Sequence, residues 1–75
     1  MIERISHLTL RELEIARLVE QGLFNKEIAR ALKIRPNTVK THLSNIFAKF
    51  NIENRTELAI RMGDANYVRR LQGNR

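Results

Sequence analysis

Short polar side chains and a few cations share one face of the stretch from Pro36 to Phe50, and this stretch contains no acidic residue. The face comprises Asn37, Thr41, Ser44 and Ala48, with Lys40 and Asn45 at its two edges. A solvated helix face more often pairs Glu with Lys four residues apart. Hydroxyl, amide and ammonium groups can hydrogen-bond base edges in the major groove of DNA, which is about 12 Å wide. The composition favours groove reading over the alternative of a plain solvated face.

The element that must position this face is a helix over residues 36–50. Pro36 suits the first helical position because its ring fixes a helical φ, and no helix breaker follows before Asn51. Apolar residues recur at i, i+4, i+7 and i+11, which is the spacing of a buried stripe. The stripe consists of Val39, Leu43, Ile46 and Phe50. The sequence thus predicts a helix with one face in a core and the polar face outside.

Length and composition restrict the function classes. The chain has 75 residues, 43% of them hydrophobic, and no cysteine. This is enough for one small helical core but leaves little room for a substrate cleft, and it excludes disulfides and thiolate metal sites. No long apolar run indicates a membrane span or a signal peptide. We therefore expect no enzyme, no metal, no cofactor, no small-molecule ligand and no membrane association, and a cytoplasmic location, at the nucleoid when bound to DNA.

Positive charge is concentrated around the polar helix. The whole chain carries a formal net charge of +6, of which residues 25–55 contribute +5, whereas residues 1–24 sum to −1. Such clustering is the electrostatic footprint of a phosphate-binding surface, although a basic face kept for solubility would look similar.

Two helices are predicted before the polar helix. Thr9 and Glu12 form a capping box for a helix over about residues 10–21, and Gly22 supplies a left-handed residue that ends it. Asn25 is predicted to cap a short helix over about residues 26–32. A short turn then leads to Pro36. Two helices joined by so short a turn, with the small Ala29 in the first, predict a helix-turn-helix unit, although an αα-hairpin without DNA function would look similar.

A fourth helix is predicted over about residues 55–62, with Asn54 and Glu57 as its capping box. Residues 65–71 are compatible with a further short helix or an extension of the fourth. We expect a flexible segment or linker remnant over residues 1–7, one domain over 8–63, and a partly helical tail over 64–75. The predicted fold class is all-α, a small four-helix bundle.

Three ordered motifs resemble the LuxR/NarL/GerE helix-turn-helix domain of bacterial transcription regulators. They are Leu8-Thr9-x-Arg11-Glu12-x-Glu14, Gly22-Leu23-x-Asn25-Lys26-Glu27-Ile28-Ala29 and Thr38-Val39-Lys40-x-His42-x-x-Asn45-Ile46-x-x-Lys49-Phe50. The resemblance covers about residues 8–62. Four positions depart from the family's usual residues: Leu10 for Pro, Phe24 for a small polar residue, Lys33 for Gly and Arg35 for a capping Ser.

The resemblance implies that the 36–50 helix lies in the major groove of double-stranded DNA. The positions that match the family's base contacts are Lys40, Thr41 and Ser44. Candidates for phosphate contacts are Asn25, Lys26, Thr38, Asn45 and Lys49, and Arg35 is long enough to add another. His42 is expected to be half-buried, and no cluster of ligands surrounds either histidine.

The resemblance also implies a homodimer through the fourth helix, with Arg55, Leu58, Ala59 and Met62 as the candidate contact. The alternative is that this apolar side only closes the core. The main rival function is a helical module that binds RNA polymerase or another regulator without specific DNA binding; such a surface would be expected to carry an exposed apolar anchor. RNA binding is a weaker rival because the polar face lacks aromatic residues for stacking. The sequence thus predicts a DNA-binding regulator of transcription, or the effector domain of one.

Overall fold

The computed structural model describes residues 8–63, and these residues form four helices and no strand. The helices are α2 (Leu10–Glu20), α3 (Asn25–Leu32), α4 (Pro36–Phe50) and α5 (Arg55–Gly63). The predicted all-α fold is confirmed for this part of the chain. Predictions for residues 1–7 and 64–75, including the further helix over 65–71, lie outside the described residues.

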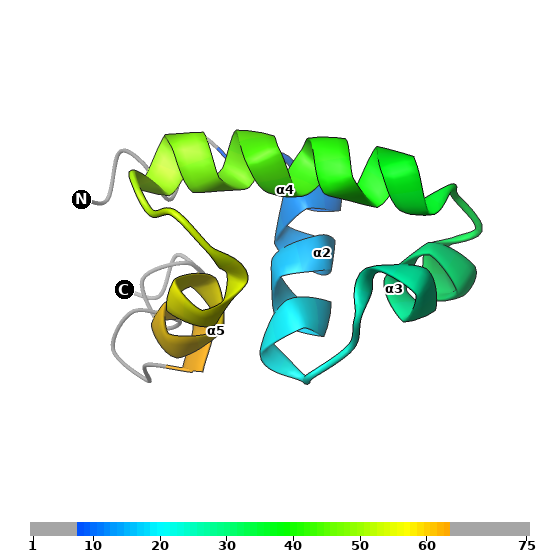
Figure 1. Ribbon diagram of the computed structural model, residues 1–75, viewed down its shortest axis with the longest axis horizontal. Helices are drawn as coiled ribbons and strands as arrows, with labels where there is room; N and C mark the ends of the chain where they lie inside the picture. The colour runs from blue at the N-terminus through cyan, green and yellow to red at the C-terminus, as the bar shows by residue number, and fades with distance from the viewer. Residues whose placement is uncertain (1–7, 64–75) are drawn as a thin grey trace.

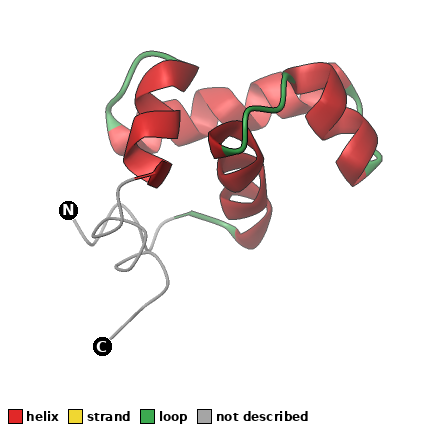
Figure 2. Cartoon of the chain, turned by 90° about the horizontal axis from the view of Figure 1, so that it is seen from below, coloured by secondary structure: helices red, strands yellow, loops and turns green. Residues whose placement is uncertain are grey.

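The longest helix, α4, crosses the other three (Figure 1). Seen from below, α2 lies in the middle with α3 and α5 on either side, and α4 runs behind them (Figure 2). All three shorter helices therefore lie on the same side of α4. Its opposite side is left uncovered by α2, α3 and α5 (Figure 1).

The core is built from the apolar stripes of all four helices. The predicted stripe of α4 is confirmed, because its four members are at most 4% exposed. Ile15, Ala16 and Val19 of α2 belong to the same core cluster as this stripe, as do Ile28 and Ala29 of α3 and Leu58 and Met62 of α5. The small side chain of Ala29 allows α3 and α4 to approach closely across their short turn. This packing fixes which face of α4 points outward.

Local signals set most helix limits. The Thr9–Glu12 capping box is confirmed, with Thr9 Oγ1 accepting from the Glu12 amide and Glu12 Oε1 accepting from the Thr9 amide, both at 3.0 Å. Gly22 follows α2 in the left-handed region at φ 95°, as predicted. Two of the four helices end one residue away from the prediction: α2 ends at Glu20 rather than residue 21, and α5 includes Gly63. Shifts of this size are ordinary at fraying helix ends.

The predicted cap of α3 is wrong. Phe24, not Asn25, occupies the N-cap position, and Asn25 is the first helical residue. The Phe24 ring offers no acceptor, so the start of α3 is held by the Glu27 carboxylate, which accepts a 2.6 Å hydrogen bond from the Phe24 amide. The Asn25 side chain is instead engaged by a residue from α5, described below.

The capping box predicted for α5 forms only in part. Asn54 Oδ1 accepts from the Glu57 amide at 2.9 Å, as expected. The Glu57 carboxylate, however, accepts from the amide of Glu53 at 2.9 Å instead of that of Asn54. The helix start is thus satisfied one residue earlier than a standard capping box would place it.

Two non-glycine residues adopt the left-handed conformation, and both end helices. Lys33 follows α3 at φ 59°, and Asn51 follows α4 at φ 56°. Asn tolerates this region well, whereas Lys carries a steric cost of about 1 kcal/mol. The Lys33 turn nevertheless places Ile34 so that its amide bonds the Ala29 carbonyl at 2.9 Å, which closes the turn between α3 and α4.

Candidate nucleic-acid interface

The uncovered side of α4 presents the polar face expected from the sequence. All three candidate base-contact residues, Lys40, Thr41 and Ser44, are exposed. The remaining members of this face are exposed as well: Asn37, Asn45 and Ala48. Because α2, α3 and α5 all lie on the other side of α4, below it in Figure 1, they leave these side chains exposed. The packing therefore leaves a row of polar groups on the exposed side of α4.

Thr41 is oriented by its own helix. Its hydroxyl donates a 3.1 Å hydrogen bond to the carbonyl of Asn37, one turn earlier. With its proton used in this way, the hydroxyl has only acceptor capacity left for an outside group, and its methyl group offers an apolar contact. On a base edge, an acceptor suits the amino groups of adenine or cytosine, and a methyl group suits that of thymine.

A shallow hollow of about 400 Å³ links this face to the starts of α3 and α5. Its floor includes the apolar Leu43 and Phe47, and its rim carries polar and charged groups. The rim residues are Asn25, Lys40, Ser44, Glu53, Asn54 and Arg55. Two candidate base contacts, Lys40 and Ser44, therefore line the same depression as one candidate phosphate contact, Asn25.

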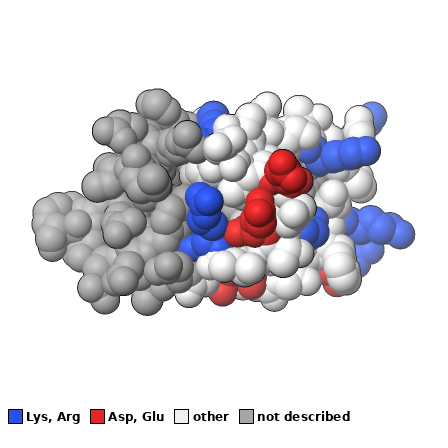
Figure 3. Space-filling model, turned by 60° about the vertical axis from the view of Figure 1, so that its left-hand side comes forward, with Lys and Arg blue, Asp and Glu red and all other residues white. Residues whose placement is uncertain are grey.

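The candidate phosphate contacts are distributed over both helices of the helix-turn-helix unit. Lys26, Arg35, Thr38 and Asn45 are exposed, and Asn25 is half-buried. The first turn of α4 contains no acidic residue, and the N-cap residue Arg35 makes no side-chain hydrogen bond to the helix start. No carboxylate of this turn therefore offsets the positive end of the helix dipole. On the face seen in Figure 3, Lys and Arg side chains stand out along the right-hand edge, and acidic side chains lie nearer the middle.

Lys49 differs from the other candidates because its ammonium group already has a carboxylate partner. Lys49 Nζ lies 2.7 Å from Glu12 Oε1, which joins the last turn of α4 to the first turn of α2. The Glu12 side chain is 5% exposed and that of Lys49 31%. The phosphate contact of Lys49 stays a prediction, and it would require the ammonium group to be shared with Glu12. The pairing of residues 37 positions apart was not visible in the sequence.

The partners of Glu12 control its protonation. Burial raises the pKa of this carboxyl, but the hydrogen bond from Lys49 and that from the Thr9 amide, together with the charges of Lys49 and His42, outweigh burial and lower the pKa below its ordinary value. A carboxyl whose pKa is lower in the folded chain stabilises the fold above its unfolded pKa of about 4.3. That stability is lost as the pH falls through the folded pKa.

Replacing Lys49 with Ala should therefore destabilise the fold by about 2–3 kcal/mol near neutral pH, because the buried Glu12 carboxylate loses its cationic partner. The loss should shrink in acid, because without Lys49 the burial of Glu12 raises the pKa of its carboxyl, so that the variant takes up the neutralising proton at a higher pH than the wild-type chain does. Urea unfolding at neutral pH and at about pH 4 measures both quantities. Lys26→Ala, which removes an exposed lysine, is the matched control and should change stability by less than about 0.5 kcal/mol. An equal effect of Lys49→Ala at both pH values would contradict this assignment.

The four candidate dimer residues are not equivalent in the structure. Leu58 and Met62 are 0% and 4% exposed and belong to the core of their own chain. Arg55 and Ala59 are half-buried. The large apolar side chain that α5 does expose is Ile60, at 68%, and the sequence-based prediction did not include it. The buried apolar residues of α5 and its exposed Ile60 thus lie on different sides of the helix.

Other site types find little support within residues 8–63. This segment has no group of three or more His, Cys, Asp or Glu side chains that could hold a metal ion. None of its helices has the length and apolar character needed to cross a membrane. His42 is half-buried, as expected.

Comparison with known proteins agrees with this geometry. The family model of bacterial regulatory proteins of the luxR family matches residues 6–62. The chain is 57% identical over 54 residues to a monoamine regulon transcriptional regulator of Klebsiella aerogenes. These 54 residues make up 72% of this chain and 24% of that protein. It is 49% identical over 53 residues to the transcriptional regulatory protein LiaR of Bacillus subtilis and to the response regulator protein VraR of Staphylococcus aureus.

The chain spans about a quarter of the length of these relatives. The family match over residues 6–62 contains all four helices described above, except for the last residue of α5. The match over residues 6–62 agrees with the fold, in which a short turn joins α3 to α4 and α4 has a polar outer face. The chain therefore belongs to the luxR family of bacterial regulatory proteins, as a helix-turn-helix domain of that family.

Proposed function

We propose that the chain binds double-stranded DNA sequence-specifically, with α4 in the major groove, and that it regulates transcription in the bacterial cytoplasm without catalytic activity. The observation that carries this proposal is the acid-free, uncovered face of α4, opposite a stripe that is at most 4% exposed. An α-helix fits the major groove, and short polar side chains on its outer face reach the base edges.

Each exposed group of this face has a distinct role in the proposal. Lys40 donates to the O6 or N7 of a guanine, Thr41 accepts from a base amino group, and Ser44 donates or accepts. Lys26 and Arg35 neutralise phosphates, while Thr38 and Asn45 hydrogen-bond them, which fixes the register of α4 without reading the sequence. Both helices of the unit thus contribute to one basic surface.

A titration of the 15N-labelled chain with a duplex of mixed sequence locates the interface. We expect the largest amide shifts on the outer face of α4 and at the start of α3. Shifts confined to the surroundings of Ile60, which is 68% exposed, with none on the outer face of α4, would contradict the proposal. That result would favour a protein-binding module instead.

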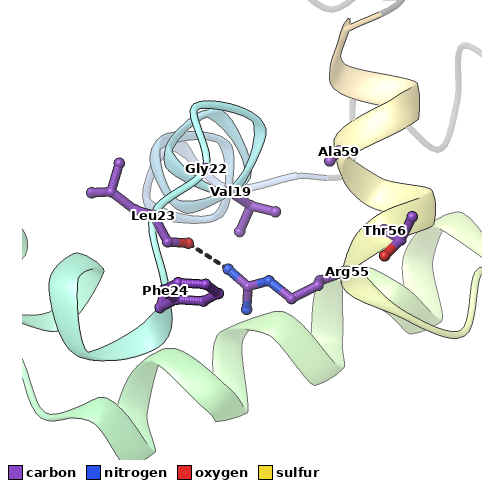
Figure 4. Close-up of a pocket in the computed structure, with 7 residues that line it drawn as sticks. All are labelled: Val19, Gly22, Leu23, Phe24, Arg55, Thr56 and Ala59. Atoms are coloured by element: carbon purple, nitrogen blue, oxygen red, sulfur yellow. Dashed lines mark hydrogen bonds between the residues drawn. The ribbon is translucent and has the colours of Figure 1, made fainter.

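We further propose that two copies pair on DNA through the exposed side of α5, centred on Ile60 and flanked by Thr56 and Ala59. Thr56 and Ala59 also line a second hollow, of about 290 Å³, beside this helix (Figure 4). A two-fold pair would place two copies of α4 in successive major grooves, about 34 Å apart. Such a contact is small, so we expect it to be weak without DNA.

Ile60→Glu tests this pairing. Loss of the apolar contact and the approach of two like charges should weaken binding to a palindromic duplex at least tenfold, because burying an Ile contributes about 1.5–3 kcal/mol. Binding to a single half-site should be unchanged. Thr56→Glu, one turn away, offers a second probe of the same side, whereas Glu57→Gln serves as the matched control. Equal affinity of wild type and Ile60→Glu for the palindrome would rule out the contact.

A further inference from the structure

One arginine from α5 contacts three consecutive residues that lead into α3. Arg55 Nη1 donates to Asn25 Oδ1 at 2.8 Å, and Nη2 donates to the Leu23 carbonyl at 2.5 Å. The guanidinium carbon also lies 6.0 Å from the centroid of the Phe24 ring, at the limit of a cation–π contact. Figure 4 shows the side chain reaching from α5 to Leu23 and Phe24. Arg55 therefore joins α5 to the α2–α3 connection.

This contact determines the orientation of the Asn25 amide. A guanidinium group has donors only, so the atom of Asn25 that faces Arg55 must be the carbonyl oxygen Oδ1. The amide nitrogen, with two donors, must point away from Arg55. An amide turned the other way would bring donor against donor. Arg55 thus fixes Asn25 as a hydrogen-bond donor toward its remaining surroundings.

Asn25 and Arg55 also line the hollow that contains Lys40 and Ser44. The start of α3 and the outer face of α4 therefore border the same hollow. Backbone amides and side-chain amides that donate hydrogen bonds are suited to phosphate oxygens. A donor fixed before binding loses less entropy on contact than one that must be ordered by the ligand.

We propose that Arg55 is a positioning residue for DNA binding: it presets the Asn25 amide to donate to a phosphate beside the bases contacted by Lys40 and Ser44. This inference rests on the proposed function. The planar fork of Arg55 is needed because it bridges two acceptors at once, the Leu23 carbonyl and Asn25 Oδ1. A lysine would keep the charge but lose this bidentate geometry.

Arg55→Lys, Asn25→Ala and the double variant, each in the full chain, test the proposal. The readouts are the affinity for one fluorescent duplex of fixed sequence and the slope of that affinity against salt. Both single variants should weaken binding about tenfold, the loss of one hydrogen bond to a charged group. The double variant should bind no more weakly than Asn25→Ala, because the two residues act through one contact. The salt slope should stay at the wild-type value.

Arg61→Lys in the same helix is the matched control and should leave affinity unchanged. Urea unfolding verifies that every variant is folded at the temperature of the titration. Wild-type affinity of Arg55→Lys, or additive losses in the double variant, would overturn the positioning role. A salt slope lowered by about one in Arg55→Ala but not in Arg55→Lys would also overturn it, because Arg55 would then contact phosphate by its charge.

A wild-type chain that binds no duplex would instead refute the proposed function and, with it, this inference. The free chain provides a separate readout. In its NMR spectrum, the side-chain amide protons of Asn25 should change their shift in Arg55→Lys and not in Arg61→Lys. An unchanged Asn25 amide in Arg55→Lys would overturn the orientation step by itself.

Discussion

Raising the salt concentration from about 50 mM to about 200 mM should weaken duplex binding by several hundredfold. Each cation that neutralises a phosphate releases condensed counterions, and four to six phosphates neutralised by Lys or Arg per domain give a log–log slope of about −4 to −5. The structure supports contacts of this kind from exposed cations such as Lys26 and Arg35. Anisotropy titrations at several salt concentrations measure the slope.

Two controls distinguish the effect of salt on phosphate contacts from effects of salt on folding or on base contacts. Unfolding in urea at both salt concentrations should give similar stability, which shows that salt acts on binding rather than on folding. A scrambled duplex should show a similar slope, since phosphate contacts do not depend on sequence. A slope near zero would contradict a phosphate-bound interface and would favour a surface that binds protein.

Lys40→Ala should weaken binding to the preferred duplex by about tenfold to a hundredfold, because one good contact to a guanine edge contributes about 1–3 kcal/mol. Binding to a scrambled duplex should change little. Lys40 is exposed and lines the hollow on the outer side of α4, so its removal should not disturb the core. Affinities for both duplexes at one salt concentration provide the measurement.

Lys26→Ala is the matched control for Lys40→Ala. Both residues are exposed lysines of the helix-turn-helix unit, but Lys26 lies on α3 and is proposed to contact phosphate. Its removal should weaken binding to both duplexes alike and reduce the salt slope by about one. If Lys40→Ala also lowered both affinities equally, the division into base and phosphate contacts would be wrong.

The sequence predicted those parts of the fold that depend on nearby residues. The limits of α4 follow from Pro36 at one end and Asn51 at the other, and its buried side follows from an apolar period, so both were predicted correctly. The capping box of α2 and the left-handed Gly22 are equally local. The outer face of α4 was predictable because it is the complement of the stripe that the core must cover.

Contacts between distant residues could not be predicted in this way. The sequence favours Asn25 as a helix cap, but in the fold its carbonyl oxygen accepts from Arg55, 30 positions later. Glu12 was recognised as a cap and not as the partner of Lys49. On α5 the apolar residues were assigned both to the core and to a dimer, and only packing shows that Leu58 is buried while Ile60 is exposed.

These tertiary contacts bear on function because they hold the helix-turn-helix unit from both ends. The Glu12–Lys49 pair attaches the end of α4 to α2, and Arg55 attaches the start of α3 to α5. Side chains that read bases must be held to a fraction of an ångström by such supporting contacts. The two pairs therefore complement the apolar core in fixing where the polar face of α4 lies.

Selection of duplexes from a random library tests whether α4 reads the DNA sequence. We expect one roughly palindromic motif to be enriched and to bind at least about a hundredfold tighter than a scrambled duplex at the same salt concentration. The preference for one base pair of that motif should disappear in Lys40→Ala. Failure to enrich any motif, with equal and salt-sensitive binding to duplexes of different sequence, would contradict sequence reading by α4.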